Sequence, residues 1–224
     1  MMKPFLSITC LALLLGAAQT VAAQGVPSRY KGLPTDTTVS IKGTSTAHDW
    51  EMKGSLIGGY FEVPAGVNFD QAQATVPGLK DGVLMATVVA RIGVNTIHST
   101  ADHLPGVMDG LMQDALKSKD FPRIEYHLTE LKLKAGHTGG KPFEFDAKGD
   151  LAIAGITNKI SFPVTIVALE KNVIKITGST KLKMTDFKVD PPAPNFGLGL
   201  MKCGDEVTID FDWTLARPAD GTAK

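Results

Sequence analysis

The stretch FEFDAKGDLAIAG, residues 143–155, alternates apolar and polar side chains with a period of two. Its apolar face consists of Phe143, Phe145, Ala147, Gly149, Leu151 and Ile153. Successive side chains of a β-strand point to opposite faces, so this pattern predicts a strand with one dry face and one wet face. Such strands are typical of antiparallel sheets, because strands of parallel sheets are usually apolar on both faces.

The same alternation recurs along most of the chain. It is strong in residues 173–184 and 207–215, and further strands are predicted at 38–43, 49–63, 83–94, 124–134 and 159–170. The total is about eight, mostly joined by short turns, which excludes parallel βαβ units. We therefore predict one all-β domain with an antiparallel sheet. A sheet of this size closes into a barrel or splits into a sandwich, and the pattern leaves both open.

One segment departs from this period. In MDGLMQDALKSKDFPRIEY, residues 108–126, the apolar side chains recur at steps of three and four, which predicts a short amphipathic helix. Its apolar face would consist of Met108, Leu111, Met112, Ala115 and Leu116. We expect Ser99, Thr100 or Asp102 to cap its start, with Asp109 near the positive end of its dipole. We expect its end before Pro122, with Lys117 and Lys119 near the negative end.

The N-terminal residues 1–23 have the features of a secretory signal peptide. Lys3 precedes an apolar run, and small residues at Val21 and Ala23 predict cleavage after Ala23. Residues 24–36 are rich in turn formers and are expected to form a flexible leader, followed by the domain at 37–217 and a tail at 218–224. Export of the mature chain is therefore expected.

Charge and cysteine content narrow the function classes further. Removing Lys3 with the signal leaves 22 basic against 23 acidic side chains, and this balance argues against a nucleic-acid partner, which would need a basic face. Only Cys203 remains after cleavage, so no internal disulfide is possible. A buried, inert thiol is the more common state of such a cysteine, with pairing of two copies into a homodimer as the alternative.

Catalytic motifs do not emerge from the sequence. It contains no Gly-x-Ser-x-Gly elbow and no phosphate-binding glycine loop. The best cluster is HSTADH, which offers His98, Asp102 and His103 as ligands for a metal-assisted hydrolase. Capping and turn hydrogen bonds explain the same residues, so the leading prediction is a protein without a metal, another cofactor or catalysis.

The apolar positions are more informative than the polar ones. Small residues such as Ala90, Ala147 and Gly178 alternate with large aromatics on the predicted dry faces. In an eight-stranded barrel, such an interior is either just filled or leaves space for one small ligand. A methionine-rich helix suits a flexible apolar lid, because methionine adapts to varied shapes. The alternative, a helix that simply plugs the core, remains open on the pattern.

Four motifs together resemble the YceI-like family. They are KGTSTAHDWEMKG (42–54), LKSKDFPRIEYHLTEL (116–131), GDLAIAGITNKISFPV (149–164) and KLKMTDFKVDPPAPNFGLGLMKCGDEVTIDF (181–211), in the family's order within residues 38–216. The resemblance implies a lipocalin-like antiparallel eight-stranded β-barrel with one short helix near its mouth. It also implies export to the periplasm of a Gram-negative bacterium and a long-chain lipid inside the barrel, without a required metal or catalysis.

Pattern and resemblance together predict a binding or carrier protein for an isoprenoid, an isoprenoid quinone or a fatty-acid derivative. Loading from a membrane surface or a membrane protein is expected. The alternative function is a filled β-domain that binds a protein partner through its surface. Alternation and the helix period nominate as ligand-binding residues Trp50, Met52, Val88, Ile92, Met108, Leu111, Met112, Leu116, Tyr126, Phe143, Phe145, Ile153, Phe162, Ile176, Leu182 and Trp213. Polar residues nominated for a lipid headgroup are His48, His98 and His103.

Overall fold

The computed structural model of the protein describes residues 25–170, 172–193 and 201–218. The signal peptide predicted at 1–23 lies outside these residues, as does the predicted tail after residue 218. The described strands are β1 (Ser28–Gly32), β2 (Thr38–Ser45), β3 (Trp50–Gly54), β4 (Gly58–Val63), β5 (Thr87–Gly93), β6 (Ile97–Ser99), β7 (Arg123–Leu133), β8 (Phe143–Ile153), β9 (Ile156–Glu170), β10 (Val173–Lys183) and β11 (Cys203–Ala216). The helical elements are α1 (Pro105–Ala115) and two 3₁₀ turns, η1 (Val94–Thr96) and η2 (Met184–Phe187).

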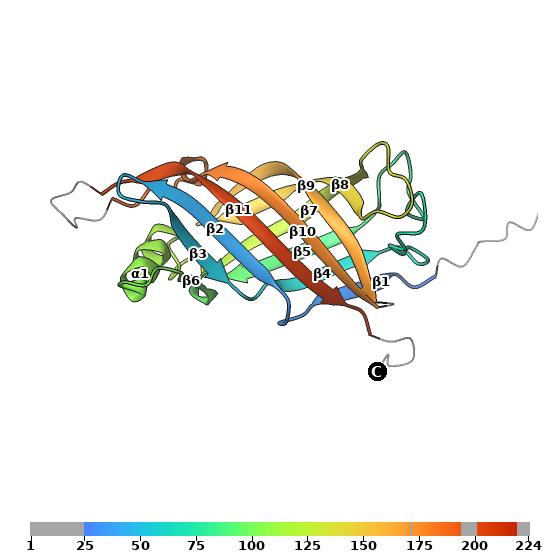
Figure 1. Ribbon diagram of the computed structural model, residues 1–224, viewed down its shortest axis with the longest axis horizontal. Helices are drawn as coiled ribbons and strands as arrows, with labels where there is room; N and C mark the ends of the chain where they lie inside the picture. Colours follow the sequence, from blue (N-terminus) through green and yellow to red (C-terminus); the bar gives the residue numbers. More distant parts are fainter. Residues whose placement is uncertain (1–24, 171, 194–200, 219–224) are drawn as a thin grey trace, which may run out of the picture.

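The strands form a closed antiparallel barrel, which confirms the predicted fold. The ring runs β1-β4-β5-β7-β8-β9-β10-β11, and pairing of Lys31 with Ala216 and of Gly32 with Leu215 closes it. Strands β2, β3 and β6 extend the wall beyond this ring, with β2 paired to the first part of β11. Figure 1 shows the resulting elongated barrel, with α1 at one end and long loops at the other.

Three of the eight wall segments are interrupted strands. β1 pairs with β4 and β2 pairs with β3, so the breaks at 33–37 and 55–57 lie side by side in the wall. β5 and β6 are separated only by η1. The prediction that residues 24–36 form a flexible leader is therefore wrong in part, because this segment contains β1, a strand of the barrel. Its turn formers concealed a strand of only five residues, too short for the alternation to register.

Two residues of β11 satisfy the backbone at these breaks. Trp213 is buried, and its Nε1 donates to the Ile57 carbonyl at 2.9 Å. The Thr214 hydroxyl donates to the Asp36 carbonyl at 2.7 Å, and the Thr214 carbonyl accepts from the Leu33 N–H at 2.8 Å. Buried backbone groups need partners, so this long strand compensates for the interrupted pairing.

The wall forks between β9 and β10. Their pairing begins near the 170–173 turn and ends at Val164 with Gly178, although both strands continue toward the α1 end. The next residue of β9, Pro163, has no N–H to donate, which explains why the ladder stops there. The Asn158 side-chain amide bridges the fork by donating to the Asp186 carbonyl in η2 at 2.8 Å. The barrel is consequently wider toward α1.

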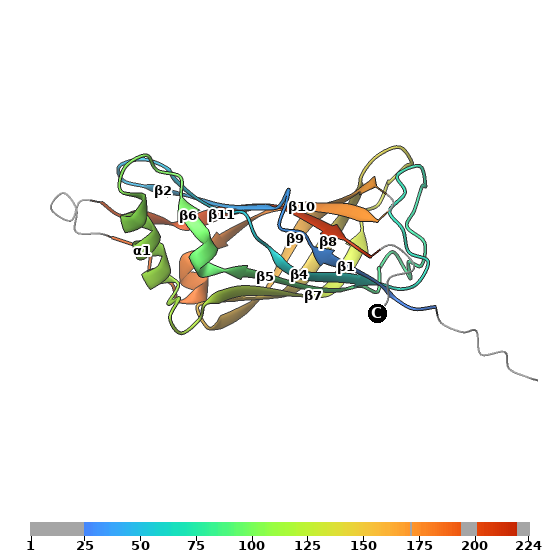
Figure 2. The same ribbon diagram turned by 90° about the horizontal axis from the view of Figure 1, so that it is seen from below.

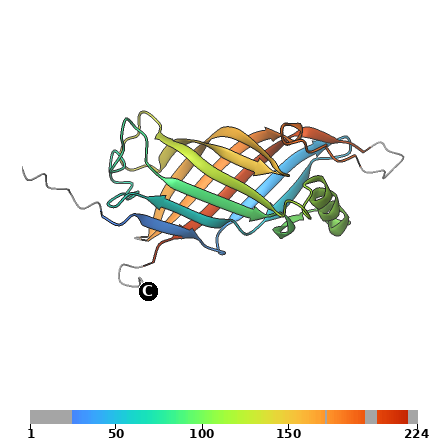
Figure 3. The same cartoon turned by 180° about the vertical axis from the view of Figure 1, so that it is seen from behind.

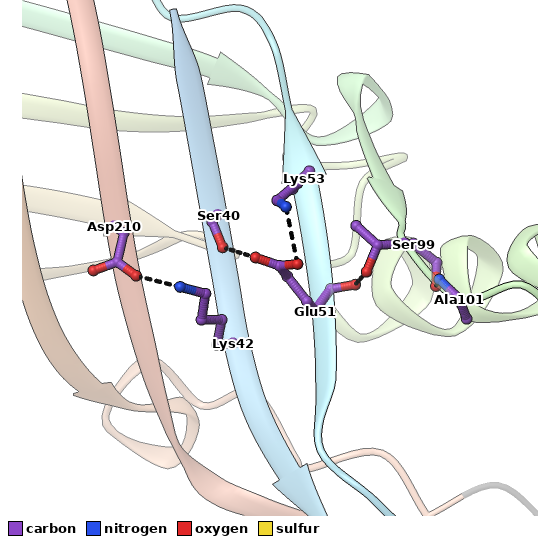
Figure 4. Close-up of polar contacts among 8 residues, drawn as sticks. Ser40, Lys42, Glu51, Lys53, Ser99, Ala101 and Asp210 are labelled. Atoms are coloured by element: carbon purple, nitrogen blue, oxygen red, sulfur yellow. Dashed lines mark hydrogen bonds and ion pairs between the residues drawn. The ribbon is translucent and has the colours of Figure 1, made fainter.

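Polar pairs on the outer face link β11, β2 and β3 (Figure 4). Lys42 Nζ lies 2.9 Å from an Asp210 carboxylate oxygen, and the Ser40 hydroxyl donates to Glu51 at 2.7 Å. The Glu51 carbonyl also accepts from the N–H of Thr100 at 3.1 Å. The last bond is the structurally important one, because it fixes the segment that leads into α1.

The barrel end away from α1 is filled by aromatic rings. Phe69, from the loop between β4 and β5, lies with its ring centre 6.3 Å from that of Phe143 and 6.5 Å from that of Phe145. The ring centre of Phe61 lies 5.8 Å from that of Phe69. All four rings are essentially fully buried. The same loop bonds to the β7–β8 loop, where the Gly140 N–H donates to the Gln71 carbonyl.

Helix α1 lies across the opposite end, beside β6 (Figures 2 and 3). Ser99, Thr100 and Asp102 do not cap it. The helix begins after Leu104, which adopts a left-handed conformation (φ 53°), with Pro105 in its first turn. It ends well before Pro122, because Lys117 is left-handed (φ 52°) and the Ser118 N–H returns to the Gln113 carbonyl. None of its residues is buried, and no described helix is long and apolar enough to cross a lipid bilayer.

We predict that Trp213→Phe destabilises the barrel by about 1–3 kcal/mol, because it leaves the buried Ile57 carbonyl without its donor. Urea unfolding with an unchanged m-value measures this cost. The control is Trp50→Phe, whose Nε1 bonds to the exposed Thr44 carbonyl, where water can replace it. Equal destabilisation by the two substitutions would contradict the role given to Trp213.

Candidate functional site: two adjoining apolar cavities

Two cavities lie inside the barrel, one in the ring and one beneath α1. The inner cavity has a volume of about 150 Å³ and the mouth cavity a volume of about 340 Å³. Five branched aliphatic side chains line both cavities, and we call them the collar: Ile41, Ile124, Ile153, Leu182 and Ile209. Because they share this collar, the two cavities adjoin along the barrel axis. The mouth cavity falls in the size range of small-molecule sites, roughly 300–1,000 Å³, and the inner cavity is smaller.

The inner cavity is walled almost entirely by hydrocarbon. Among its lining side chains only Tyr126, Thr180 and Trp213 carry polar atoms, and the Trp213 indole already donates to Ile57. No lysine, arginine, histidine or carboxylate lines it. A charged group placed there would be unpaired in an apolar medium, which is very costly. The inner cavity therefore suits an uncharged, largely hydrocarbon chain.

The mouth cavity combines the apolar face of α1 with the widened end of the barrel. Leu104, Val107, Met108, Leu111, Met112, Ala115 and Leu116 line it from the helix side. Met52, Met184 and Met201 line it from the barrel side, so five methionines surround one space. Methionine is flexible and polarisable, so this wall can adjust to ligands of different shape.

Comparison with known proteins agrees with this architecture. The profile of the YceI-like domain matches residues 30–215, nearly the whole described chain. The chain belongs to the YceI-like family. No curated protein sequence matches it.

Two of the solved structures that are similar to this YceI-like domain share its fold at low sequence identity. BcnA of Burkholderia cenocepacia is 18% identical with a TM-score of 0.57, covering 82% of this chain and 98% of its own. A polyisoprenoid binding domain from Saccharophagus degradans, implicated in plant cell wall breakdown, is 14% identical with a TM-score of 0.58, covering 84% and 98%. The YceI protein of Campylobacter jejuni is 16% identical with a TM-score of 0.49, covering 75% and 85%.

The cavities contain most of the residues nominated from the sequence. Those lining the inner cavity are Val88, Ile92, Tyr126, Ile153, Phe162, Ile176, Leu182 and Trp213. Those lining the mouth cavity are Trp50, Met52, Met108, Leu111, Met112 and Leu116, together with Ile153 and Leu182 of the collar. The structure thus brings them together around one apolar space; that they bind a ligand stays a prediction.

Phe143 and Phe145 are the exceptions, and their nomination as ligand-lining residues is wrong. Both point inward, as the alternation predicts, but they pack against Phe69 at the closed end and line neither cavity. Gly178 also leaves no space, because a Cβ added there would lie 2.6 Å from the Phe211 ring. Alternation identifies the inner face of a strand but not what fills the space opposite.

Several lining residues were missed. Collar residues Ile41, Ile124 and Ile209 occupy predicted strands, and their alternation was sufficient to find them. Phe187 and Val189, which follow β10 and line the mouth cavity, have no such signal because they lie in and after a 3₁₀ turn.

Two of the three nominated histidines line the mouth cavity and one does not. His48 and His103 line the mouth cavity, so they stay candidates for contact with a polar headgroup. His98 does not line it; its side chain is largely exposed and its Nδ1 lies 2.8 Å from Asp109 Oδ2. The structure does not bring His98, Asp102 and His103 together, and the described residues contain no group of three His, Cys, Asp or Glu side chains that could hold a metal.

Cys203 lines the mouth cavity beside Trp50 and is partly buried. Burial raises the pKa of its thiol, and the neighbouring Trp50 indole offsets only part of this rise. The thiol is therefore a poor nucleophile at neutral pH. Pairing of two copies through it stays a prediction.

Asp109 ties α1 to the barrel wall. One carboxylate oxygen accepts from the Ser99 N–H of β6 at 2.6 Å, and the other contacts His98. Burial alone would raise the pKa of Asp109, but the hydrogen bonds from His98 and Ser99 outweigh it, and its pKa lies below the ordinary value. The carboxylate is thus held charged, and it contacts β6 rather than the helix N-terminus that its spacing predicted.

We predict that Asp109→Ala loosens α1 while the barrel stays folded. Amide hydrogen exchange in residues 104–117 should accelerate by about tenfold, as expected for losing one charge-assisted bond of which part is exposed. Asp114→Ala is the control, because that side chain is exposed on the same helix. Because the pKa of Asp109 is lowered, its tether is fully present above the ordinary carboxyl pKa. Wild type and variant should converge only as the pH falls through the lowered pKa.

We also predict that Leu182→Trp obstructs the collar. A probe long enough to reach the inner cavity should bind at least tenfold more weakly, whereas a short probe that fits the mouth cavity should still bind. Overpacking costs about 1–3 kcal/mol, so urea unfolding must accompany the binding titrations. The control is Lys181→Trp, which introduces the same side chain on the outer face of β10. Equal losses for long and short probes would show that the collar is not a passage.

Proposed function

We propose that this YceI-like protein is a periplasmic carrier that holds one long-chain lipid along the barrel axis. The observation that carries the proposal is the pair of adjoining apolar cavities, one inside a closed barrel and one beneath a helix with no buried residue. A domain built only to be stable would fill this space with side chains, since interiors are normally close-packed. The filled aromatic end of the same barrel shows that the fold can do so.

The free energy of such binding comes from burial of hydrocarbon. Each CH₂ removed from water contributes about 0.8 kcal/mol, so a long chain gains far more from an apolar tunnel than from any single polar contact. On β10, Ile176 and Leu182 both line the inner cavity and lie about 20 Å apart along the strand. An extended chain that also fills the mouth cavity would be longer than this.

Isoprenoids, isoprenoid quinones and fatty-acid derivatives all fit this description. The polyisoprenoid binding domain from Saccharophagus degradans, which shares the fold, supports the isoprenoid class. The signal-like residues 1–23 support export, and they lie outside the described structure. We further propose that binding, not catalysis, is the function, because the inner cavity presents no titratable pair to a ligand.

Loading would occur at the α1 end. Leu104 and Val107, at the start of the helix, are 68% and 38% exposed, yet both also line the mouth cavity. A lipid that is nearly insoluble in water must come from a membrane surface or a membrane protein. Large exposed apolar side chains at the entrance suit either source.

Organic extraction of the protein, purified without an affinity tag, followed by mass spectrometry tests the proposal. A stoichiometric co-purifying lipid supports the carrier function. A protein that neither contains a lipid nor takes one up from vesicles would instead favour a β-domain that acts through its surface.

We predict that Met112→Asp reduces the extracted lipid at least tenfold while the far-ultraviolet circular dichroism of the barrel is unchanged. The substitution places a carboxylate in the largely apolar wall of the mouth cavity, and the charge would have to be desolvated on ligand binding. Gln113→Asp adds the same charge one residue along, outside the cavity lining. Undiminished loading of Met112→Asp would contradict the role given to α1.

A further inference from the structure

Tyr126 of β7 carries the one buried side-chain polar atom that lacks a hydrogen-bond partner within the described residues, its hydroxyl oxygen. Its side chain lines the inner cavity next to the collar, two residues from Ile124. A phenylalanine would fill the same space without leaving a buried hydroxyl unsatisfied, which destabilises a protein. The position therefore carries a hydroxyl that the fold itself does not use.

The surrounding residues fix the ring of Tyr126. It packs edge-on against Phe162, with ring centres 5.5 Å apart and planes at 60°. It also lies over Gly149 of β8, where an added Cβ would lie 2.5 Å from two of its ring carbons. Any larger residue at 149 would displace the ring. The orientation of the hydroxyl is consequently set by the barrel wall and not by a hydrogen bond.

The hydroxyl is a donor at every physiological pH. Burial, and then the negative charge of Asp150 on the outer face, raise the pKa of Tyr126 far above its ordinary value. Of the other polar lining groups, the Trp213 indole already donates to Ile57, and Thr180 lies on β10, across the barrel. An acceptor for Tyr126 must therefore come from a molecule in the cavity.

We propose that Tyr126 donates a hydrogen bond to an uncharged oxygen of the bound lipid at the level of the collar. This inference rests on the proposed carrier function and deepens it by naming a ligand class. The class comprises long-chain lipids that carry a carbonyl, ether or hydroxyl oxygen where the two cavities meet. A charged oxygen does not fit on the inner side of the collar, because no cationic side chain lines the inner cavity and Lys183 lines only the mouth cavity.

The test compares two probes on delipidated protein, a linear alkane and the methyl ketone of equal chain length, each displacing a fluorescent long-chain probe. Wild type should bind the ketone about tenfold more tightly, which corresponds to about 1.4 kcal/mol. Tyr126→Phe should lose this preference and bind both probes equally. The control is Tyr60→Phe, whose ring lies beneath Arg29 outside the cavity lining and which should retain the preference.

Two further readouts separate a hydrogen bond from a change of shape. The infrared carbonyl stretch of the bound ketone should lie at lower frequency in wild type than in Tyr126→Phe. The delipidated Tyr126→Phe protein should unfold at a higher urea concentration than wild type, because it no longer buries an unpaired hydroxyl. Tyr60→Phe should show neither change.

The outcomes are distinguishable. If wild type binds both probes equally, or if Tyr126→Phe keeps the ketone preference, the inference about Tyr126 is overturned while the carrier function stands. If wild type binds neither probe, the carrier function and the inference fall together.

Discussion

The structure depends on how β11 compensates for two broken strands. Between β1 and β2, and between β3 and β4, the backbone hydrogen bonds of the wall are interrupted. Trp213 and Thr214 donate hydrogen bonds to backbone carbonyls in these two breaks. Because the breaks are satisfied from a neighbouring strand, the barrel can close at one end with β1 and β4 and widen at the other with β2, β3 and β6. The fork that Pro163 imposes between β9 and β10 adds to this widening. Closure and opening are thus built from the same eight wall segments.

The two ends of the barrel solve opposite physical problems. At the closed end, Phe69 from a long loop packs against rings from β4 and β8, and burial of these rings supplies stability. At the open end, α1 is held by Asp109 and by contacts with β6 and buries none of its side chains. The apolar space beneath it remains, because flexible methionines line it rather than fill it. Stability and ligand capacity are therefore located in different parts of one sheet.

Much of the fold was predictable because period-two alternation is a local property that survives in a single sequence. It placed Ile176 and Leu182 on the inner face of β10, where the structure has them. It failed to separate Ile153 from Phe143, which share the inner face of β8 although only Ile153 lines a cavity. Phe69 makes the difference, because it packs against Phe143 and fills the space there. It is remote in sequence and lies in a loop whose side chains show no regular alternation. The helix ends were also missed: left-handed residues such as Leu104 and Lys117 leave no compositional signal, although Pro105 in the first turn is a recognised signal of a helix start.

That α1 contributes no buried side chain has a consequence for how such a protein can change over generations. Substitutions in a fully packed element usually cost stability, and this cost limits which of them survive. Replacements on α1 avoid most of that cost, so the entrance can be retuned toward lipids of other shapes while the barrel and its aromatic end are preserved.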